Sequence, residues 1–468
     1  MLKCVSALLA TPVARVALLL TLSAGLGHAA YGQLIFGSPA SYQAGSYPHS
    51  VVVADFNADG RPDLVTANNG GGNVSVLLAL VGGGFAAPRD YRTGSGTNSV
   101  ATADFNADGR PDLVTTNEDD NSVTVLMAQA TGGFASAVSY PTDRKPNGVV
   151  VADFNGDGRP DLATANNYGD NVSVLLAQAT GGFAPVVSYP TVIYPIGLVV
   201  ADFNDDGRPD LVTASGDVVA VLLAQASGGF ATSQFYNTDA YAQGLAVGDF
   251  NGDGRPDLAV SSYFDSKVSV ILGQAGGSFA AAVKYDVGTS PRGVVVGDVN
   301  GDGRLDLVVA NYGSGTISVL LAQATGGFAP AVAHSAGYYP WDMAVADLNG
   351  DGRPDLAVAN GVSSLGVSVL LNKSSLPLAS VPALSAAVQI FPNPTTRRFT
   401  VQVPGITGAT LVEATLFNAL SQPVRHQSVR LPGTGTSFDM WAGELPAGVY
   451  SLRLTAGTVN LTKRVVLH

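Results

Sequence analysis

The chain contains very little cysteine, histidine or charge for its length. Among 468 residues there is one cysteine, there are five histidines, and charged residues make up 13%. A lone cysteine, Cys4, excludes an intramolecular disulfide, and neither a Gly-x-Ser-x-Gly nor a His-Glu-x-x-His motif is present. No apolar run reaches the roughly 20 residues that a transmembrane helix needs. Disulfide scaffolds, membrane-spanning proteins and the common serine and zinc hydrolases are therefore disfavoured.

What the chain has in abundance is repetition. The nine-residue phrase Asp-x-Asn-x-Asp-Gly-Arg-x-Asp occurs seven times, beginning at Asp55, Asp104, Asp153, Asp202, Asp249, Asp298 and Asp347. Successive copies are 49, 49, 49, 47, 49 and 49 residues apart. A period of this length is typical of repeat folds, in which each unit buries its apolar face against its neighbours.

Each phrase is a row of hard oxygen donors, the ligand chemistry that calcium prefers. The glycine at position six permits the sharp turn that such a loop requires. An EF-hand is excluded, because its loop needs a glutamate at position twelve and helices on both sides. In the third copy position twelve is Thr164, and apolar β-branched runs flank the loop. A simpler alternative is that these residues only form turns. Seven repetitions favour calcium, and magnesium suits a many-oxygen cage less well.

We therefore predict one Ca²⁺ site per repeat, up to seven in all, with ligands at positions one, three, five, seven and nine. The predicted side-chain ligands are Asp55, Asn57, Asp59, Asp63, Asp104, Asn106, Asp108, Asp112, Asp153, Asn155, Asp157, Asp161, Asp202, Asn204, Asp206, Asp210, Asp249, Asn251, Asp253, Asp257, Asp298, Asn300, Asp302, Asp306, Asp347, Asn349, Asp351 and Asp355. The predicted backbone carbonyl ligands are those of Arg61, Arg110, Arg159, Arg208, Arg255, Arg304 and Arg353. The loops hold more than half of the acidic residues. The net charge of −12 therefore gives no information on whether a binding partner is positively or negatively charged, and we expect no nucleic-acid ligand.

Each period also contains four short strand-like runs, which in the first repeat are 51–54, 64–67, 74–78 and 85–91. The first three are continuous apolar runs, as in strands buried on both faces, and Gly, Asn or Pro interrupts them before a helix could form. Four short strands per repeat, repeated radially, describe a propeller blade. We therefore predict an all-β, seven-bladed β-propeller with calcium-binding loops over residues 30–372.

The seventh repeat stops after three strand-like runs, at Asn372. In the other repeats the fourth run begins with phenylalanine and small residues, followed by an aromatic or hydrophobic residue. The same pattern occurs ahead of the first loop, from Phe36 to Tyr42. We expect residues 34–42 to supply the missing fourth strand, because closing the ring removes sheet edges that would otherwise pair with other chains.

The loops in their four-strand context resemble the FG-GAP/VCBS repeats of the integrin α-subunit propeller and of many secreted bacterial proteins. The resemblance covers roughly residues 31–372 and implies both the propeller fold and the metal. It leaves the activity open, because the family includes adhesins, receptors and accessory parts of polysaccharide-degrading enzymes.

The two ends of the chain carry export features. Residues 1–29 are predicted to be a secretory signal peptide, because Lys3 and Arg15 precede a short apolar run and Gly27-His28-Ala29 offers a cleavage site. Residues 373–387, rich in Ser, Pro and Ala, are predicted to be a linker.

The last domain, residues 388–468, is predicted to be a small β-sandwich. It resembles the type A C-terminal sorting domain of the type IX secretion system of Bacteroidetes. The motifs that carry the likeness are Phe391-Pro392-Asn393-Pro394, Leu445 to Tyr450, and the basic-apolar ending Lys463 to His468. The resemblance implies the type IX machinery as a partner and a secreted or cell-surface location. An unrelated accessory β-sandwich is the alternative.

A binding face is predicted opposite the metal loops. No transmembrane segment is predicted in the chain. The positions six residues before each loop should ring the central channel, and they differ while their surroundings repeat: His49, Asn98, Asn147, Ile196, Gln243, Arg292 and Trp341. The polar and aromatic members of this ring are the candidate ligand contacts. The same face should gather Tyr168, Tyr194, Tyr241, Tyr263, Phe264, Tyr312, Tyr338 and Tyr339. Aromatic rings beside amides suit glycans or extended peptides.

We therefore predict an extracellular binding or adhesion protein for glycan or protein ligands. No catalytic residue is predicted. The alternative is a polysaccharide lyase or glycosidase, or its accessory module, because carboxylates outside the loops, such as Asp342, could pair across a sugar. Release of cleaved product would distinguish the enzyme from the binding protein.

Overall fold

The structure is a computed structural model. It describes residues 34–130, 133–238, 241–362, 366–374, 388–391, 395, 398–404, 411–417, 423–432, 435–446, 448–456 and 459–467. Every regular element in these ranges is a β-strand, and no helix there is long and apolar enough to cross a membrane. The predicted signal peptide and most of the predicted linker lie outside the described residues.

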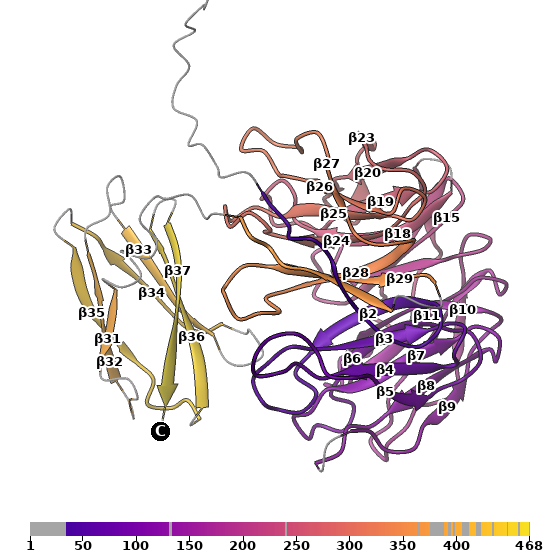
Figure 1. Cartoon of the computed structure of the whole chain (residues 1–468), viewed down its shortest axis with the longest axis horizontal. Helices are drawn as coiled ribbons and strands as arrows, with labels where there is room; N and C mark the ends of the chain where they lie inside the picture. Colours follow the sequence, from indigo (N-terminus) through magenta and orange to yellow (C-terminus); the bar gives the residue numbers. More distant parts are fainter. Residues whose placement is uncertain are drawn as a thin grey trace, which may run out of the picture.

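Residues 34–374 form repeated four-stranded antiparallel sheets that resemble propeller blades (Figure 1). The first three are β2 (Pro48–Ala54), β3 (Asp63–Asn68), β4 (Asn73–Leu77) and β5 (Arg89–Arg92); β6 (Thr97–Ala103), β7 (Asp112–Asn117), β8 (Ser122–Leu126) and β9 (Val138–Pro141); and β10 (Pro146–Ala152), β11 (Asp161–Asn166), β12 (Asn171–Leu175) and β13 (Val187–Pro190). The next three are β14 (Gly197–Ala201), β15 (Asp210–Ser215), β16 (Val218–Leu222) and β17 (Gln234–Asn237); β18 (Ala242–Gly248), β19 (Asp257–Ser262), β20 (Lys267–Ile271) and β23 (Val283–Asp286); and β24 (Pro291–Gly297), β25 (Asp306–Asn311), β26 (Thr316–Leu320) and β27 (Val332–Ser335). A small ribbon of β21 (Gly273–Gln274) and β22 (Ser278–Phe279) interrupts the fifth sheet.

A further sheet combines the two ends of this region. Strands β28 (Pro340–Ala346), β29 (Asp355–Asn360) and β30 (Val367–Leu370) are joined by β1 (Ala40–Tyr42), which pairs with β30 in the register Ala40↔Val369. Just before β1, Phe36 forms an isolated bridge with Asn372. The segment from Phe36 to Tyr42 therefore pairs along the edge of the last three strands.

The strands of a sheet differ in how deeply they are buried. All six residues of β3 are buried, and the equivalent second strand of every other sheet shows the same pattern. The fourth strand is mostly exposed, as in β5. It is shorter than the sequence predicts, because Phe85 lies outside β5 in an isolated bridge with Ala79 that closes a glycine-rich turn.

The hydrophobic core between these sheets is divided into seven clusters, each shared by two neighbouring sheets. One of them joins the first sheet to the last, since Val51, Leu64 and Leu77 pack with Ala357 and Val369. The orange β28 accordingly lies beside the indigo β2 in Figure 1, and the two strands are in contact. Burial of this kind is the main stabilising contribution to a repeat fold.

An aromatic pair repeats across each boundary between sheets. The ring of the fourth-strand residue meets the phenylalanine of the next sheet edge-on, with ring centroids 5.1–5.6 Å apart. The pairs are Tyr42–Phe85, Tyr91–Phe134, Tyr140–Phe183, Tyr189–Phe230, Tyr236–Phe279, Tyr285–Phe328 and His334–Phe36. Edge-to-face geometry is favoured by the ring quadrupoles. His334 thus takes a structural tyrosine position, and burial lowers the pKa of its imidazole.

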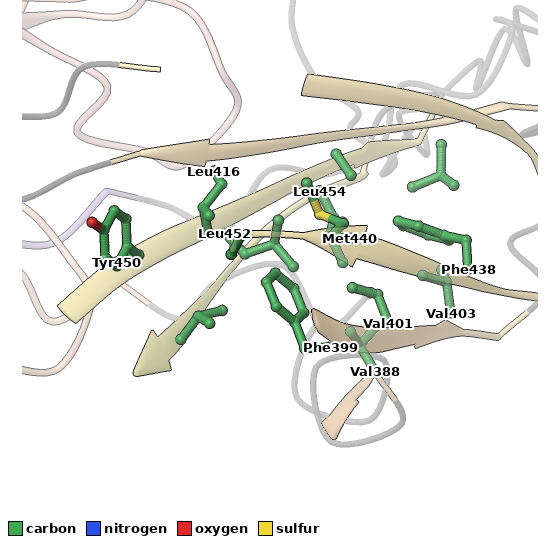
Figure 2. Packing of buried hydrophobic residues seen from close by; sticks show 14 of the residues in the cluster. Val388, Phe399, Val401, Val403, Leu416, Phe438, Met440, Tyr450, Leu452 and Leu454 are labelled. Carbon is green, nitrogen blue, oxygen red and sulfur yellow. The ribbon is translucent and has the colours of Figure 1, made fainter. Parts of the chain in front are cut away.

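The C-terminal region has two antiparallel sheets with a shared core. One contains β31 (Gln389–Phe391), β32 (Arg398–Val403) and β35 (Thr436–Trp441); the other contains β34 (Pro423–Arg430), β33 (Leu411–Phe417), β36 (Gly448–Ala456) and β37 (Val459–Leu467). Figure 2 shows Phe399, Val401 and Met440 of the first sheet facing Leu416 and Leu452 of the second. The alternating burial in β32 and β33 is the period-two pattern of such strands.

Candidate functional site

The Asp-rich loops lie between the first and second strands of each sheet and share one conformation. In the first loop the carboxylate of Asp55 accepts hydrogen bonds from the backbone N–H of Asp59 at 3.0 Å and of Gly60 at 2.7 Å. The amide oxygen of Asn57 accepts a second bond from the Asp59 N–H. The same bonds recur in the other loops. The position-six glycines have φ between 80° and 86°, the left-handed region for which the sequence selects glycine.

The position-nine aspartates are completely buried in every sheet. The carboxylate of Asp63 accepts the backbone N–H of Phe56 at 3.0 Å and that of Ala79 at 2.7 Å, which ties the loop to the end of the third strand. Burial raises the pKa of Asp63, and the nearby charges of Asp59 and Asp55 raise it further against the effect of these two bonds. The three carboxylates of a loop therefore repel one another. In the sixth and seventh loops the pKa of Asp306 rises to about 7 and that of Asp355 to about 6.

The position-seven arginines have a role that the sequence prediction did not include. The prediction assigned a role only to the backbone carbonyl of Arg61. Its guanidinium also forms an ion pair with the position-five carboxylate of Asp59 and donates a hydrogen bond from Nε to the carbonyl of Ala79 at 3.2 Å. All seven loops have the ion pair. Each arginine thus compensates part of the negative charge of its loop.

The donor chemistry of the loops suits calcium, although the side chains are also engaged within the protein. Carboxylate and amide oxygens at positions one, three and five gather around each turn, and each carboxylate offers about four lone-pair sites, of which the N–H donors use only some. Within the described residues, however, no three His, Cys, Asp or Glu side chains form a ready metal-binding group. The loops thus have the ligand types for a metal, and hydrogen bonds and the arginine occupy part of their acceptor capacity.

At the opposite end of the first strands lies a cavity of about 390 Å³. All seven ring positions line it, one from each sheet: His49, Asn98, Asn147, Ile196, Gln243, Arg292 and Trp341. The structure thus brings together residues that are spread over some 290 positions of sequence, and only Ile196 among them is aliphatic. Asn167, Tyr241 and Asp342 contribute to the same wall.

Five of the ring residues are linked in a continuous row. The indole of Trp341 lies between the imidazole of His49, stacked at 3.6 Å and 7°, and the guanidinium of Arg292, 3.6 Å above the ring. His49 Nδ1 is 2.6 Å from the Asn98 amide oxygen, and Arg292 Nη1 donates to Gln243 Oε1 at 3.2 Å. Both faces of Trp341 are therefore covered, so the indole offers a ligand its edge rather than its face.

Among the described residues that line the cavity, Arg292 is the one with a permanent positive charge. Arg292 lies within 5.0 Å of the Tyr263 ring and 4.9 Å of the Tyr312 ring, and it also hydrogen-bonds to Tyr263. The contacts of its side chain within the described residues are to Gln243, Tyr263, Tyr312 and Trp341, none of them a carboxylate, and its Nε is buried without a hydrogen-bond partner. Burial lowers the pKa of His49 to about 4, with a smaller contribution from the Arg292 charge, so His49 is neutral at physiological pH.

The first strands approach one another closely below the ring. A Cβ added to Gly244 would lie 2.1 Å from the Arg292 carbonyl oxygen, so this position requires glycine. At the equivalent position of the last sheet stands Asp342, whose carboxylate accepts hydrogen bonds from Ser50 and Val51 of β2 and from Met343. Burial raises the pKa of Asp342 to about 6. This carboxylate bridges the last sheet and the first.

Tyrosines surround this end of the sheets. Tyr47, Tyr194, Tyr241 and Tyr339 each precede a first strand with φ between 54° and 62°, a left-handed conformation that is rare for bulky residues. Their side chains are about half exposed, and Tyr168, Phe264 and Tyr338 are more exposed still. Tyr263 and Tyr312 instead pack against Arg292. The predicted aromatic face thus divides into an exposed rim and an inner pair.

Comparison with known families identifies the repeats. A family described as an FG-GAP-like repeat matches residues 55–115, 104–164, 153–213, 202–260, 249–309 and 298–358. The chain belongs to the FG-GAP-like repeat family. The six matches overlap and together span the seven loops. A comparison with curated proteins finds no match.

A second family covers the end of this FG-GAP-like protein. Residues 389–468 match a secretion system C-terminal sorting domain, which corresponds to the β-sandwich of β31 to β37. This tail is a type IX sorting domain and implies export to the cell surface or the extracellular space through the type IX machinery. Of the motifs that predicted it, residues 392–394, 447 and 468 lie outside the described residues.

Solved structures share the fold at low sequence identity. BBS1N, solved in complex with ARL6DN and soaked with lead, is 12% identical with a TM-score of 0.52, covering 74% of this chain and 99% of that chain. A functionally unknown protein from Desulfotomaculum acetoxidans is 12% identical with a TM-score of 0.46, covering 70% of this chain and 90% of that chain. The first of these shows a likeness of fold alone.

Proposed function

We propose that this protein is a secreted or cell-surface, calcium-stabilised seven-bladed β-propeller that binds an extracellular glycan or protein ligand. The single observation that carries the binding role is the cavity, where seven equivalent positions converge in a frame that otherwise repeats. Structural repeats keep the residues that packing requires. The repeats here keep the buried second strand and the loop but vary in the side chains that line the cavity.

The chemistry of the cavity favours a polar ligand. Amides of Asn98, Asn147 and Gln243 supply both donors and acceptors, and Arg292 supplies further donors, in a concave site of the size used by small ligands. The exposed tyrosine rim around it offers flat apolar surface with a hydroxyl at the end. Rings of this kind stack on sugars and hydrogen-bond to their hydroxyl groups. A glycan is therefore our first choice of ligand, ahead of an extended peptide.

Calcium is proposed as a structural ion in the loops. It would be held by the oxygens of positions one, three, five and nine and the position-seven carbonyl, as in Asp153, Asn155, Asp157, Asp161 and Arg159. Burial chiefly raises the pKa of each position-nine carboxyl and the neighbouring carboxylates raise it further; a cation bound there would offset this repulsion. The loops lie at the far end of the first strands from the cavity, so the metal would stiffen the blades without contacting the ligand.

The closed ring is supported by packing as well as by pairing. The cluster shared by the first and last sheets contains completely buried leucines, and β1 occupies what would be a free edge. With β1 in place, the edge of β30 is paired like the third strand of the other sheets, so the last sheet presents no additional unpaired edge.

The proposal is tested with the purified full chain on an array that contains neutral and acidic glycans and extended peptides. We expect saturable binding to a class of glycan that Asn147→Ala weakens about tenfold without a change in melting temperature. The same ligands are incubated with the protein and analysed for new reducing ends or unsaturated products. Absence of any binding would refute the proposed function, whereas product release would replace it with the enzymatic alternative.

A further inference from the structure

We propose that the cavity recognises an acidic saccharide and binds its oxyanion, a uronate carboxylate or a sulfate, at Arg292. This inference rests on the proposed glycan-binding function and adds the chemical class of the ligand. The observation behind it is that Arg292 is a largely buried cation in a cavity wall whose surroundings, within the described residues, contain no anion paired with it.

The first step is electrostatic. Removing a charge from water is costly, and buried charges in proteins are therefore normally paired with an opposite charge. The described partners of Arg292 are the Gln243 amide oxygen, the Tyr263 hydroxyl and three aromatic rings, all of them uncharged. Cation–π contacts offset part of the desolvation cost but leave the formal charge uncompensated.

Asp342 does not serve as the missing anion. It lines the same cavity, yet its carboxylate is directed to Ser50 and Val51 across the boundary between the first and last sheets. Within the described residues, the hydrogen bonds of Asp342 go to Ser50, Val51 and Met343, while the guanidinium of Arg292 bonds to Gln243 and stacks on Trp341. The two side chains are thus directed to different partners.

The second step concerns geometry. The guanidinium is fixed by its stacking on Trp341 and by the bond to Gln243, so little side-chain freedom remains to be lost when an anion binds. A fixed, planar guanidinium presents parallel N–H donors that match the oxygens of a carboxylate or sulfate. His49 is neutral and hydrogen-bonded to Asn98, so it contributes neither repulsion nor a second cation.

The third step concerns the remainder of the ligand. Next to Arg292 the wall offers the amides of Gln243, Asn98 and Asn147, which suit the hydroxyl groups of a sugar. A cavity of about 390 Å³ falls at the lower end of the range for small-molecule sites, so it suits a terminal sugar unit rather than a long segment. A peptide carboxylate would also satisfy Arg292, and peptide backbone groups would pair with these amides, but an extended peptide is longer than a cavity of this size. The compact cavity therefore favours a terminal acidic sugar over an extended peptide.

The test measures binding of the purified full chain by isothermal titration calorimetry. The probes are a galacturonate trisaccharide, a sulfated chondroitin tetrasaccharide, a neutral cello-oligosaccharide of matched length and a C-terminal acidic peptide. We expect at least one acidic saccharide to bind at least about tenfold more tightly than the neutral one, and the uronate and sulfate probes distinguish the two oxyanions. Raising the salt concentration should weaken that binding.

Two variants locate the anion. Arg292→Gln should lower the affinity for the acidic saccharide about tenfold or more, so that this saccharide no longer binds more tightly than the neutral probe. Arg292→Lys should retain only part of the affinity, because lysine lacks the planar guanidinium fork. Arg92→Gln on the exposed fourth strand of the first sheet removes the same charge and should have no effect. Should Arg292→Gln fail to fold, competition by inorganic sulfate against the acidic saccharide on the unaltered protein tests the same site.

The outcomes separate the inference from the function it builds on. Tight binding of the neutral glycan that Arg292→Gln leaves unchanged would overturn the anion site but support glycan binding. Preference for the acidic peptide over every saccharide would overturn the saccharide class. Absence of binding to every glycan probe, acidic and neutral, would overturn both proposals.

Discussion

At the scale of single residues, the side chains that line the cavity also pack on one another. Trp341 was expected from sequence to present an aromatic surface to a ligand. Its ring is instead stacked between His49 and Arg292, so it holds the cation in place. A residue that packs on two neighbours contributes to folding as well as to binding, and substitutions at this position should affect both.

Replacing Trp341 should therefore destabilise the protein. Trp341→Ala removes the stacking partner of both neighbours, and we expect a loss of about 3 kcal/mol in the free energy of unfolding, together with weaker ligand binding. Trp341→Phe should recover most of the stability. Urea denaturation followed by circular dichroism measures the effect. An Ala variant as stable as the parent would mean that the stack contributes little.

Asp342 should make stability depend on pH. The pKa of this carboxyl is about 6 in the folded protein against an ordinary value of 3.8, so the folded state holds its proton more tightly than the unfolded state. Its contribution to stability is complete below the unfolded pKa and is lost as the pH rises through about 6. Asp342→Asn removes this titration. The stability of the variant relative to the parent should rise by on the order of 2 kcal/mol between pH 4 and pH 7.

Denaturation curves at several pH values measure this difference. The buried loop aspartates titrate in both proteins and cancel in the comparison. Asp217→Asn, at an exposed turn, is the matched control and should leave the pH dependence of the parent unchanged. A constant difference between Asp342→Asn and the parent across the range would contradict the prediction.

At the scale of elements, the short strand β1 has an effect larger than its length suggests. Three residues pair with β30, and the segment before them places Phe36 against His334 and Asn372. Tyr42 adds the aromatic contact with Phe85 of the first sheet. The segment thus contacts the sixth, seventh and first sheets, so it joins parts of the chain that are remote in sequence.

Deleting residues 34–42 should expose the edge of β30 and remove two of the aromatic pairs. We expect a clear fall in melting temperature and a tendency to aggregate, because an unpaired edge recruits other chains. Size-exclusion chromatography and thermal denaturation measure both effects. Tyr91→Ala, which removes one equivalent ring from an ordinary sheet, should be milder. A deletion variant that stays monomeric with the parent melting temperature would argue against closure by this segment.

At the scale of the whole molecule, the loops and the cavity lie at opposite ends of the same first strands, and the sorting tail is a separate sandwich with its own core. The loops, the cavity and the sorting tail can therefore be altered separately, and the effects of each change can be measured.

Removing calcium should lower the stability of the protein. Extracellular sites of this type bind at roughly 10⁻⁴ to 10⁻³ M, and an ion that binds only the folded state raises its stability by mass action. We expect chelation by EGTA to lower the melting temperature and calcium, but not an equal concentration of magnesium, to restore it. Asp153→Ala should reduce the calcium stoichiometry by one site. An unchanged melting temperature after chelation would disprove the structural metal.

Removing the sorting tail should abolish display without unfolding the repeats. A truncation that ends near Ser375 retains every sheet up to β30, so we expect it to fold in a heterologous cytoplasm. In a host with type IX machinery it should stay in the periplasm, because the domain at 389–468 is missing. Protease shaving of intact cells measures exposure. Surface display of the truncated chain would contradict the role of the tail.

The sequence by itself determined the local and periodic features of this protein. The spacing of Asp, Asn and Gly determines the loop conformation through contacts within nine residues, and the repeat period with its buried runs determines the four-stranded sheets. The ring positions were also predictable, because a strict repeat places equivalent residues at equivalent heights. Only the tertiary structure revealed the stacking of His49, Trp341 and Arg292, the bridge from Asp342 to the first sheet, and the pairing of each loop arginine with its neighbouring aspartate. The stack of His49 on Trp341 and the bridge from Asp342 depend on the meeting of strands some 290 residues apart, and the arginine pairs depend on side-chain directions within the loop; periodicity alone encodes neither.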